Sequence, residues 1–213
     1  MRKETFEMVY PNAYKGVKQI LLAEILTIVS VILIVGGTIL AVLGVGEESA
    51  VNALVGAGVL IAGAVVVVAA FLLQLIGVIN GKKDEVNFRN ALIFILLGIA
   101  ISIAKSFAGE SSGLYHGMEA STSFCSLFIT YYILAAIESL AGKLNKEEVK
   151  ALACKTRKLT CIAFSAAVLV ELVATFIASP VVIAVLAVAA AVLKIVAYLL
   201  FLKALIKAKA MLA

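Results

Sequence analysis

Residues 17–44 read VKQILLAEILTIVSVILIVGGTILAVLG, and this stretch decides the class of fold. Its two charged residues, Lys18 and Glu24, lie near its start, and no charge follows in the rest of the run. An α-helix needs about 20 apolar residues to cross the roughly 30 Å hydrocarbon core of a bilayer. A core helix of a soluble protein is shorter and keeps a polar face. The stretch therefore predicts a membrane-spanning helix, long enough to tilt or to bend at Gly36-Gly37.

Five further apolar runs follow, separated by short polar breaks. The chain is 64% hydrophobic, whereas soluble domains are about half apolar. We predict an all-α integral membrane protein, because only helices and closed barrels satisfy the backbone in lipid and no alternating barrel strands are visible. In this interpretation residues 1–213 form a single membrane domain. The six predicted spans are 17–44, 51–79, 90–107, 120–141, 159–178 and 181–205.

Basic residues gather on one side of the predicted membrane. Of the 18 Lys and Arg residues, all but Lys105 and Lys194 lie at the N-terminal end, around the two main polar breaks or in the C-terminal tail. Short basic loops stay in the cytoplasm. The pattern predicts a multi-pass protein of the cytoplasmic (plasma) membrane with both termini in the cytoplasm. This grouping of basic residues also accounts for the net charge of +5. The expected partner is therefore the lipid bilayer, and no nucleic acid is expected.

The six spans are expected to form three helical hairpins related by an internal repeat. Each hairpin begins with a basic residue ahead of an apolar run, and Lys18, Arg89 and Arg157 hold corresponding positions. Duplication of this kind is common in transport folds. It is equally an economical way to build any helical bundle.

Two predicted spans carry a charge near their middle, Glu171 in the fifth and Lys194 in the sixth. A lone charge at that depth costs at least about 2.5–3.5 kcal/mol on insertion scales. Two opposite charges on consecutive helices could offset each other as a buried ion pair, or Lys194 could extend its ammonium group to the membrane interface. The same pair could relay protons or cations, or anchor a substrate. Glu24 and Glu138 lie closer to the cytoplasmic ends of their spans and are interpreted as interfacial.

The fourth predicted span carries a polar stripe. Ser123, Ser126 and Thr130 share one helix face by their spacing. Such a stripe could line a watery path through the membrane. Alternatively, these hydroxyls donate to backbone carbonyls or to neighbouring helices.

Small residues recur within the spans. Gly77 and Gly81 form a GxxxG pattern, and Gly56, Gly58 and Gly63 crowd the start of the second span. Small residues let membrane helices approach closely. We interpret them as packing sites within one chain, with a homo-oligomer contact as the alternative.

The sequence predicts no enzyme, no cofactor and no metal site. Residues 109–113 match a GxSxG pattern near His116, but a nucleophile elbow needs a strand–turn–helix context that this chain lacks. His116 and Glu119 are too few for a convincing metal site.

The string QLIGVINGKKDEVNFRNALIFILLGI, from Gln74 to Ile99, resembles a recurring group of small multi-pass membrane proteins of Gram-positive bacteria. The three-hairpin plan is similar in architecture to acid-resistance membrane proteins built from three two-helix repeats. Both resemblances imply a helical membrane fold. Neither implies an assigned function or a functional residue for this chain.

Two hypotheses for function follow from the sequence. The first is a small transporter or channel for a proton, an ion or a small solute, which would use Glu171, Lys194 and the hydroxyls of the fourth span. The second is a non-transporting membrane subunit, assembly factor or stress-linked protein, which would use its small-residue surfaces and basic loops to bind a membrane-complex partner.

Overall fold

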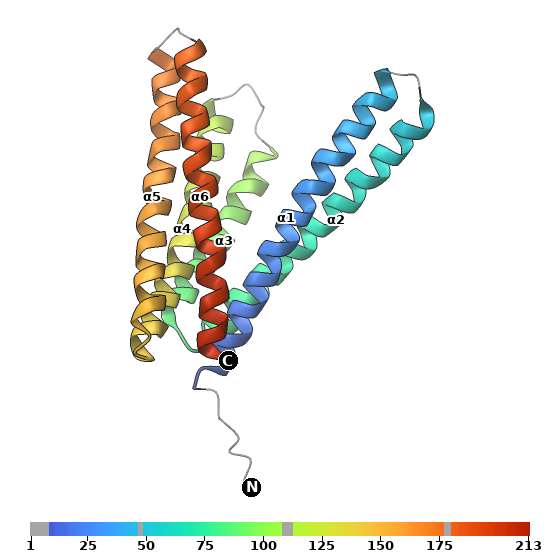
Figure 1. Ribbon diagram of the computed structural model, residues 1–213. Helices are drawn as coiled ribbons and strands as arrows, with labels where there is room; N and C mark the ends of the chain where they lie inside the picture. The colour runs from blue at the N-terminus through green and yellow to red at the C-terminus, as the bar shows by residue number, and fades with distance from the viewer. Residues whose placement is uncertain (1–8, 47–48, 108–112, 177–179) are drawn as a thin grey trace.

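A computed structural model describes residues 9–46, 49–107, 113–176 and 180–213, and these residues form α-helices joined by short turns. Figure 1 shows their arrangement. The helices are α1 (Pro11–Gly46), α2 (Ala50–Gly81), α3 (Val86–Lys105), α4 (Gly113–Lys143), α5 (Glu147–Phe176) and α6 (Pro180–Leu212).

Five of these helices are long and apolar enough to cross a membrane, namely all but α5. They present large apolar side chains to their surroundings: Leu54 is 76% exposed and Ile32 is 66% exposed. Such surfaces suit lipid and not water. The chain is therefore a helical multi-pass membrane protein. The first part of α5, EEVKALACKTRKL, is too polar to contribute to a span, and its side chains beyond Val170 lie outside the described residues.

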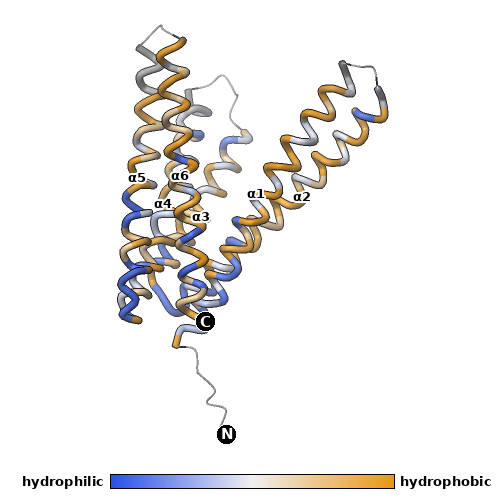
Figure 2. The backbone as a smooth tube through the Cα atoms, viewed as in Figure 1, coloured by the Kyte–Doolittle hydropathy of each residue, from blue (hydrophilic) through white to orange (hydrophobic). Residues whose placement is uncertain are grey.

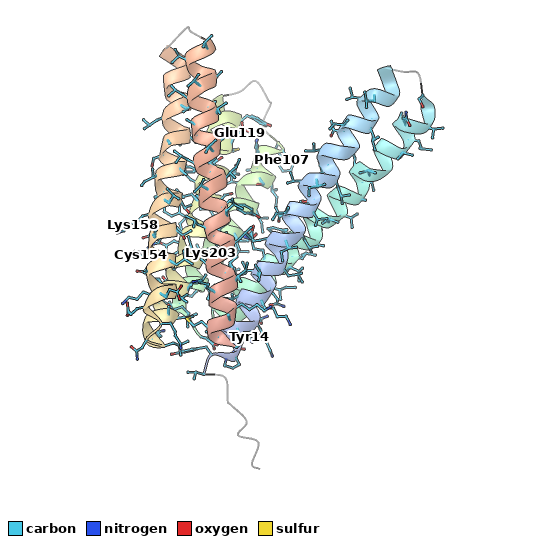
Figure 3. The ribbon with its side chains drawn as sticks, in the orientation of Figure 1. Tyr14, Phe107, Glu119, Cys154, Lys158 and Lys203 are labelled. Carbon is cyan, nitrogen blue, oxygen red and sulfur yellow. The ribbon has the colours of Figure 1, made fainter. Side chains whose placement is uncertain are left out.

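Hydrophilic residues concentrate at one end of the molecule, where the C-terminus lies beside the start of α1 (Figure 2). Tyr14 and Lys203 lie toward this end, whereas Phe107 and Glu119 lie toward the other (Figure 3). The main buried cluster is also at the hydrophilic end and includes Val17, Phe88, Ile137, Leu140 and Leu205. We call it the basal core.

The α1–α2 hairpin leans away from the other four helices (Figure 1). In the described part of the chain, α1 packs on α2 and α6, and α2 packs on α1 and α3. The basal core draws on α1 and α2 only through residues near the base of the hairpin. The far half of the hairpin is therefore two helices thick and exposed on both sides.

A seam of small residues holds the two helices of this hairpin together. Buried small residues recur at every seventh position, Gly16, Ala23, Ser30, Gly37 and Gly44 on α1, and Gly56, Gly63, Ala70 and Gly77 on α2. A seven-residue repeat keeps one face of each helix against its partner.

The backbones touch along the seam. A Cβ atom on Gly44 would lie 2.3 Å from the Ala53 nitrogen, and one on Gly16 would lie 2.5 Å from the Gly77 carbonyl oxygen. Gly77 and Gly81 therefore pack within one chain, as the sequence predicted. By contrast, Gly58 has no neighbour in reach. The helix α1 runs without interruption through Gly36-Gly37, and Gly37 packs on α2.

The turn between α2 and α3 ties the hairpin to the bundle. The Asp84 carboxylate accepts the backbone N–H of Ala13 at 2.8 Å and the Asn12 side-chain amide at 3.0 Å. Asp84 thereby caps the N-terminus of α1, where amides lack helical partners and a negative charge is favourable.

The next residue, Glu85, reaches α4. Only 4% of Glu85 is exposed. Its carboxylate accepts hydrogen bonds from Ser139 Oγ at 3.0 Å and from Lys143 Nζ at 2.5 Å. Burial by itself would raise the pKa of the Glu85 carboxyl, but the hydrogen bonds from Lys143 and Ser139 and the charge of Lys143 hold that pKa below its usual value. Asp84 and Glu85, which are adjacent in the turn between α2 and α3, thus attach this turn to α1 and α4.

Glu138 and Arg157 join α4 to α5. Arg157 Nη2 lies 3.1 Å from Glu138 Oε2, and the guanidinium also lies over the Tyr131 ring, 5.0 Å from its centroid. The attraction between Arg157 and Glu138 is ionic, because that oxygen has no hydrogen bond of good geometry.

Candidate functional site: a cavity with two opposite charges

A cavity of about 360 Å³ lies between α1, α4, α5 and α6. Its apolar wall consists of Leu127, Ala163, Phe164, Ala197 and Phe201. Its polar wall consists of Glu24, Ser123, Ser126, Thr130, Thr160, Lys194 and Tyr198. The cavity is the place in the described structure where a carboxylate, an ammonium group and several hydroxyls face a common space within the span region. We call it the charged cavity.

Glu24 enters this site from α1. It lies about 20 Å from the first residue of that helix at a rise of about 1.5 Å per residue. The Tyr198 hydroxyl is 3.0 Å from Glu24 Oε2 and 3.3 Å from the backbone oxygen of the same residue. The hydroxyl donates to the carboxylate, which joins α1 to α6. Glu24 is therefore a cavity residue in this structure, whereas the sequence alone suggested the interface.

Lys194 enters from α6. It precedes Tyr198 by four residues, so the two side chains share a helix face about one turn apart. Among the described residues, neither Glu24 nor Lys194 takes part in an ion pair. The side chain of Glu171 lies outside the described residues, so the predicted pair of Glu171 and Lys194 does too.

The predicted polar stripe of α4 lies on the wall of the charged cavity. Each of its three hydroxyls also donates to a carbonyl one turn earlier on the same helix. Ser123 bonds to Glu119, Ser126 to Thr122 and Thr130 to Ser126, each at 3.2 Å. The two alternatives given for this stripe, lining a polar space and donating to backbone carbonyls, therefore do not exclude each other. A hydroxyl that donates to its own helix keeps lone pairs free to accept from a ligand.

Thr160 of α5 adds a further hydroxyl and donates to the Thr156 carbonyl at 2.9 Å. Sequence analysis did not single out Thr160 or Tyr198. A threonine or tyrosine in a span is common, and only the packing of α5 and α6 against α1 and α4 brings these two residues to the cavity.

A second cavity of about 510 Å³ lies between α2, α3 and α4. Its polar lining consists of Gln74, Ser102, Ser106, Thr122 and Ser126. Ser126 lines both cavities. The α1–α2 hairpin contributes to each of them, with Glu24 to the first and Gln74 to the second. A change in the tilt of the hairpin would therefore alter both spaces.

The other predicted features give no second site. The GxSxG residues Gly109–Ser112 and the side chain of His116 lie outside the described residues. Among the described side chains, no three of His, Cys, Asp or Glu gather as metal ligands. On the far side from the basal core, Lys105 Nζ lies 3.5 Å from Glu119 Oε1 and 4.2 Å from the Tyr115 ring centroid.

The charged cavity offers a negatively charged acceptor, a positively charged donor and hydroxyl acceptors, in a space of the size that suits a small solute. These groups can bind and orient a polar molecule without a cofactor. Comparison with family models, with curated proteins and with solved structures finds no match to this chain.

Proposed function

We propose that this protein is a small transporter of the cytoplasmic membrane that carries a polar solute through the charged cavity. The observation that carries the proposal is the convergence of Glu24, Lys194 and the α4 hydroxyls on one space. Each charge in a span costs at least about 2.5–3.5 kcal/mol on insertion scales. Intramembrane charges that face a cavity commonly mark a substrate or ion pathway.

The proposal includes six spans, with α5 and α6 as the third of three repeated hairpins and both termini in the cytoplasm. The grouping of basic residues near the termini supports this orientation. A C-terminal green fluorescent protein fusion should fluoresce, and an alkaline phosphatase fusion at the same place should be inactive. The reverse result would overturn the orientation and leave the charged cavity in place.

The α1–α2 hairpin provides a mechanism for access to the site. Its helices are bound tightly to each other by the small-residue seam, whereas its contacts with the other helices lie near its base. Rigid-body rocking of one unit against another is the usual basis of alternating access. We infer that tilting of this hairpin opens the charged cavity.

The proposal is tested by flux in proteoliposomes that contain the purified full-length protein. Swelling with a panel of small solutes and a pH-sensitive dye would report solute and proton movement. Glu24→Gln should reduce flux by about tenfold to a hundredfold, because a hydrogen bond to a charged group contributes about 1.5–3 kcal/mol. Glu147→Gln is the matched control, since Glu147 is exposed and pairs with Lys150 on the same helix. Equal flux in the two variants would overturn the proposal.

A second candidate is a non-transporting subunit or assembly factor. The far half of the α1–α2 hairpin supports it, because that half projects away from the other helices and is apolar on both sides. Extraction from native membranes in mild detergent tests this candidate. Co-purification of one stoichiometric partner, lost when Leu54 and Ile61 are replaced by polar residues, would favour it over transport.

A further inference from the structure

The two charges of the charged cavity have opposite signs, and no charged partner satisfies either of them among the described residues. Glu24 is fixed by Tyr198. Lys194 lies about one turn, or about 6 Å, from Tyr198 toward the N-terminus of α6. A carboxylate and an ammonium group therefore line the same small space at different heights.

We propose that the charged cavity binds a small zwitterion, with its ammonium group on Glu24 and its acidic group on Lys194. The assignment of this ligand as a transported substrate rests on the proposed function, whereas binding stands apart from it. The hydroxyls of Ser126, Thr130 and Thr160 line the same space and can accept remaining N–H or O–H donors of the ligand.

Other ligand classes fit the two charges less well. A simple cation would be attracted by Glu24 and repelled by Lys194. A simple anion would be attracted by Lys194 and repelled by Glu24. A neutral solute would leave both groups without an oppositely charged partner. A zwitterion compensates both charges, and a cavity of about 360 Å³ lies near the small end of ligand sites.

This ligand chemistry has two sources. A free amino acid carries an ammonium and a carboxylate, and the headgroup of an ethanolamine phospholipid carries an ammonium and a phosphate. Both share the pair of charges that the cavity would recognise. The test must therefore present the two sources separately.

The test is equilibrium binding to the full-length protein in nanodiscs that contain only phosphatidylglycerol. The probes are radiolabelled serine, ethylamine, propionate and soluble short-chain phosphatidylethanolamine. In the wild type, serine should bind at least about tenfold more tightly than either singly charged probe. Binding of labelled phosphatidylethanolamine without serine binding would support the proposal with lipid as the source.

The variants are Glu24→Gln and Lys194→Gln, each of which should weaken zwitterion binding by about tenfold or more. A crossover distinguishes recognition from loss of structure. Lys194→Gln should improve ethylamine binding, and Glu24→Gln should improve propionate binding, because each change removes a repulsion. Lys203→Gln is the control, since Lys203 is exposed on the same helix and does not line the cavity.

The wild-type comparison keeps the test decisive even if a variant fails to fold. Equal affinity for serine, ethylamine and propionate, or no binding of serine and phosphatidylethanolamine, would overturn the proposal. If flux still depends on Glu24 in that case, transport stands and the ligand class is wrong. If flux also fails, both proposals fall.

Discussion

Two nearby glycines of α2, Gly56 and Gly58, should respond to the same substitution in opposite directions. Gly56 faces α1, and a Cβ atom there would lie 2.4 Å from the Ala41 nitrogen and 2.8 Å from the Ala41 Cα atom. A Cβ atom on Gly58 would have no neighbour within 4 Å. We therefore expect Gly56→Ala to destabilise the hairpin and Gly58→Ala to stabilise it.

The magnitude follows from two contributions. Replacing Gly by Ala inside a helix is favourable by about 0.8–1.0 kcal/mol, and this gain applies at both positions. At Gly56 the nearest atoms belong to the backbone of α1, so the helices must separate by about 1 Å, and forced shifts of this kind cost about 1–3 kcal/mol. Because the helix-propensity gain is common to both variants, the clash alone sets the difference between their free energies of unfolding.

The measurement is unfolding of the full-length protein in mixed micelles by titration with sodium dodecyl sulfate, followed by circular dichroism. Gly58→Ala should be up to about 1 kcal/mol more stable than wild type. Gly56→Ala should be about 1–3 kcal/mol less stable than Gly58→Ala. Equal stability of the two variants would refute the reasoning that the seam brings the backbones of α1 and α2 into contact.

Three further predictions concern links between helices. Asp84→Ala should cost about 1 kcal/mol of stability, because it removes the cap of α1, and thermal unfolding would measure the loss. Lys143→Met should cost about 1–3 kcal/mol at neutral pH, because it leaves the buried Glu85 with neutral donors alone. The folded-state pKa of Glu85 lies below the ordinary value of 4.5, so the contribution of this pair is present above that pH and is lost as the pH falls through the folded-state pKa. Melting curves of wild type and Lys143→Met should therefore converge in acid, and a constant gap would contradict the link. Tyr198→Phe should cost about 1.5–3 kcal/mol in thermal unfolding, because it removes a hydrogen bond to a carboxylate, and should reduce flux less than Glu24→Gln does, since the carboxylate remains.

The class of fold could be predicted from the sequence because the apolar runs are longer than soluble helices and nearly free of charge. The predicted spans all lie inside α1 to α6 apart from short stretches at their ends. The predicted ends of the helices were less accurate. Polar residues, such as those in the first helical turns of α5, continue a helix beyond its apolar run. Hydropathy detects the lipid-facing length of a helix and not its full length.

The small-residue seam was present in the sequence but was not recognised as a seven-residue repeat. Grouping Gly56, Gly58 and Gly63 by proximity mixed residues from two faces of α2. Only the seven-residue spacing separates Gly56 and Gly63, which pack on α1, from Gly58, which does not. The same spacing assigns Gly37 to the seam and leaves Gly36 open.

Part of the lining of the charged cavity was singled out from the sequence. Ser123, Ser126, Thr130 and Lys194 were recognised as polar residues of spans, and all four line the charged cavity. Glu24 was assigned to the interface because a charge in the first turns of a span usually lies there. Its contact with Tyr198 joins the first and last helices, and such a pairing depends on tertiary packing that local sequence does not encode.

The contact between Glu24 and Tyr198 connects the site to the motion of the hairpin. Near the cavity, this hydrogen bond joins α1 to α6. A ligand ammonium that pairs with Glu24 must share the carboxylate with the Tyr198 hydroxyl or displace it. Occupancy of the site therefore changes a contact between the hairpin and the bundle directly. In the proposed mechanism α1 and α2 move together, so that change would also reach Gln74 on the wall of the second cavity and would couple binding to opening through one carboxylate.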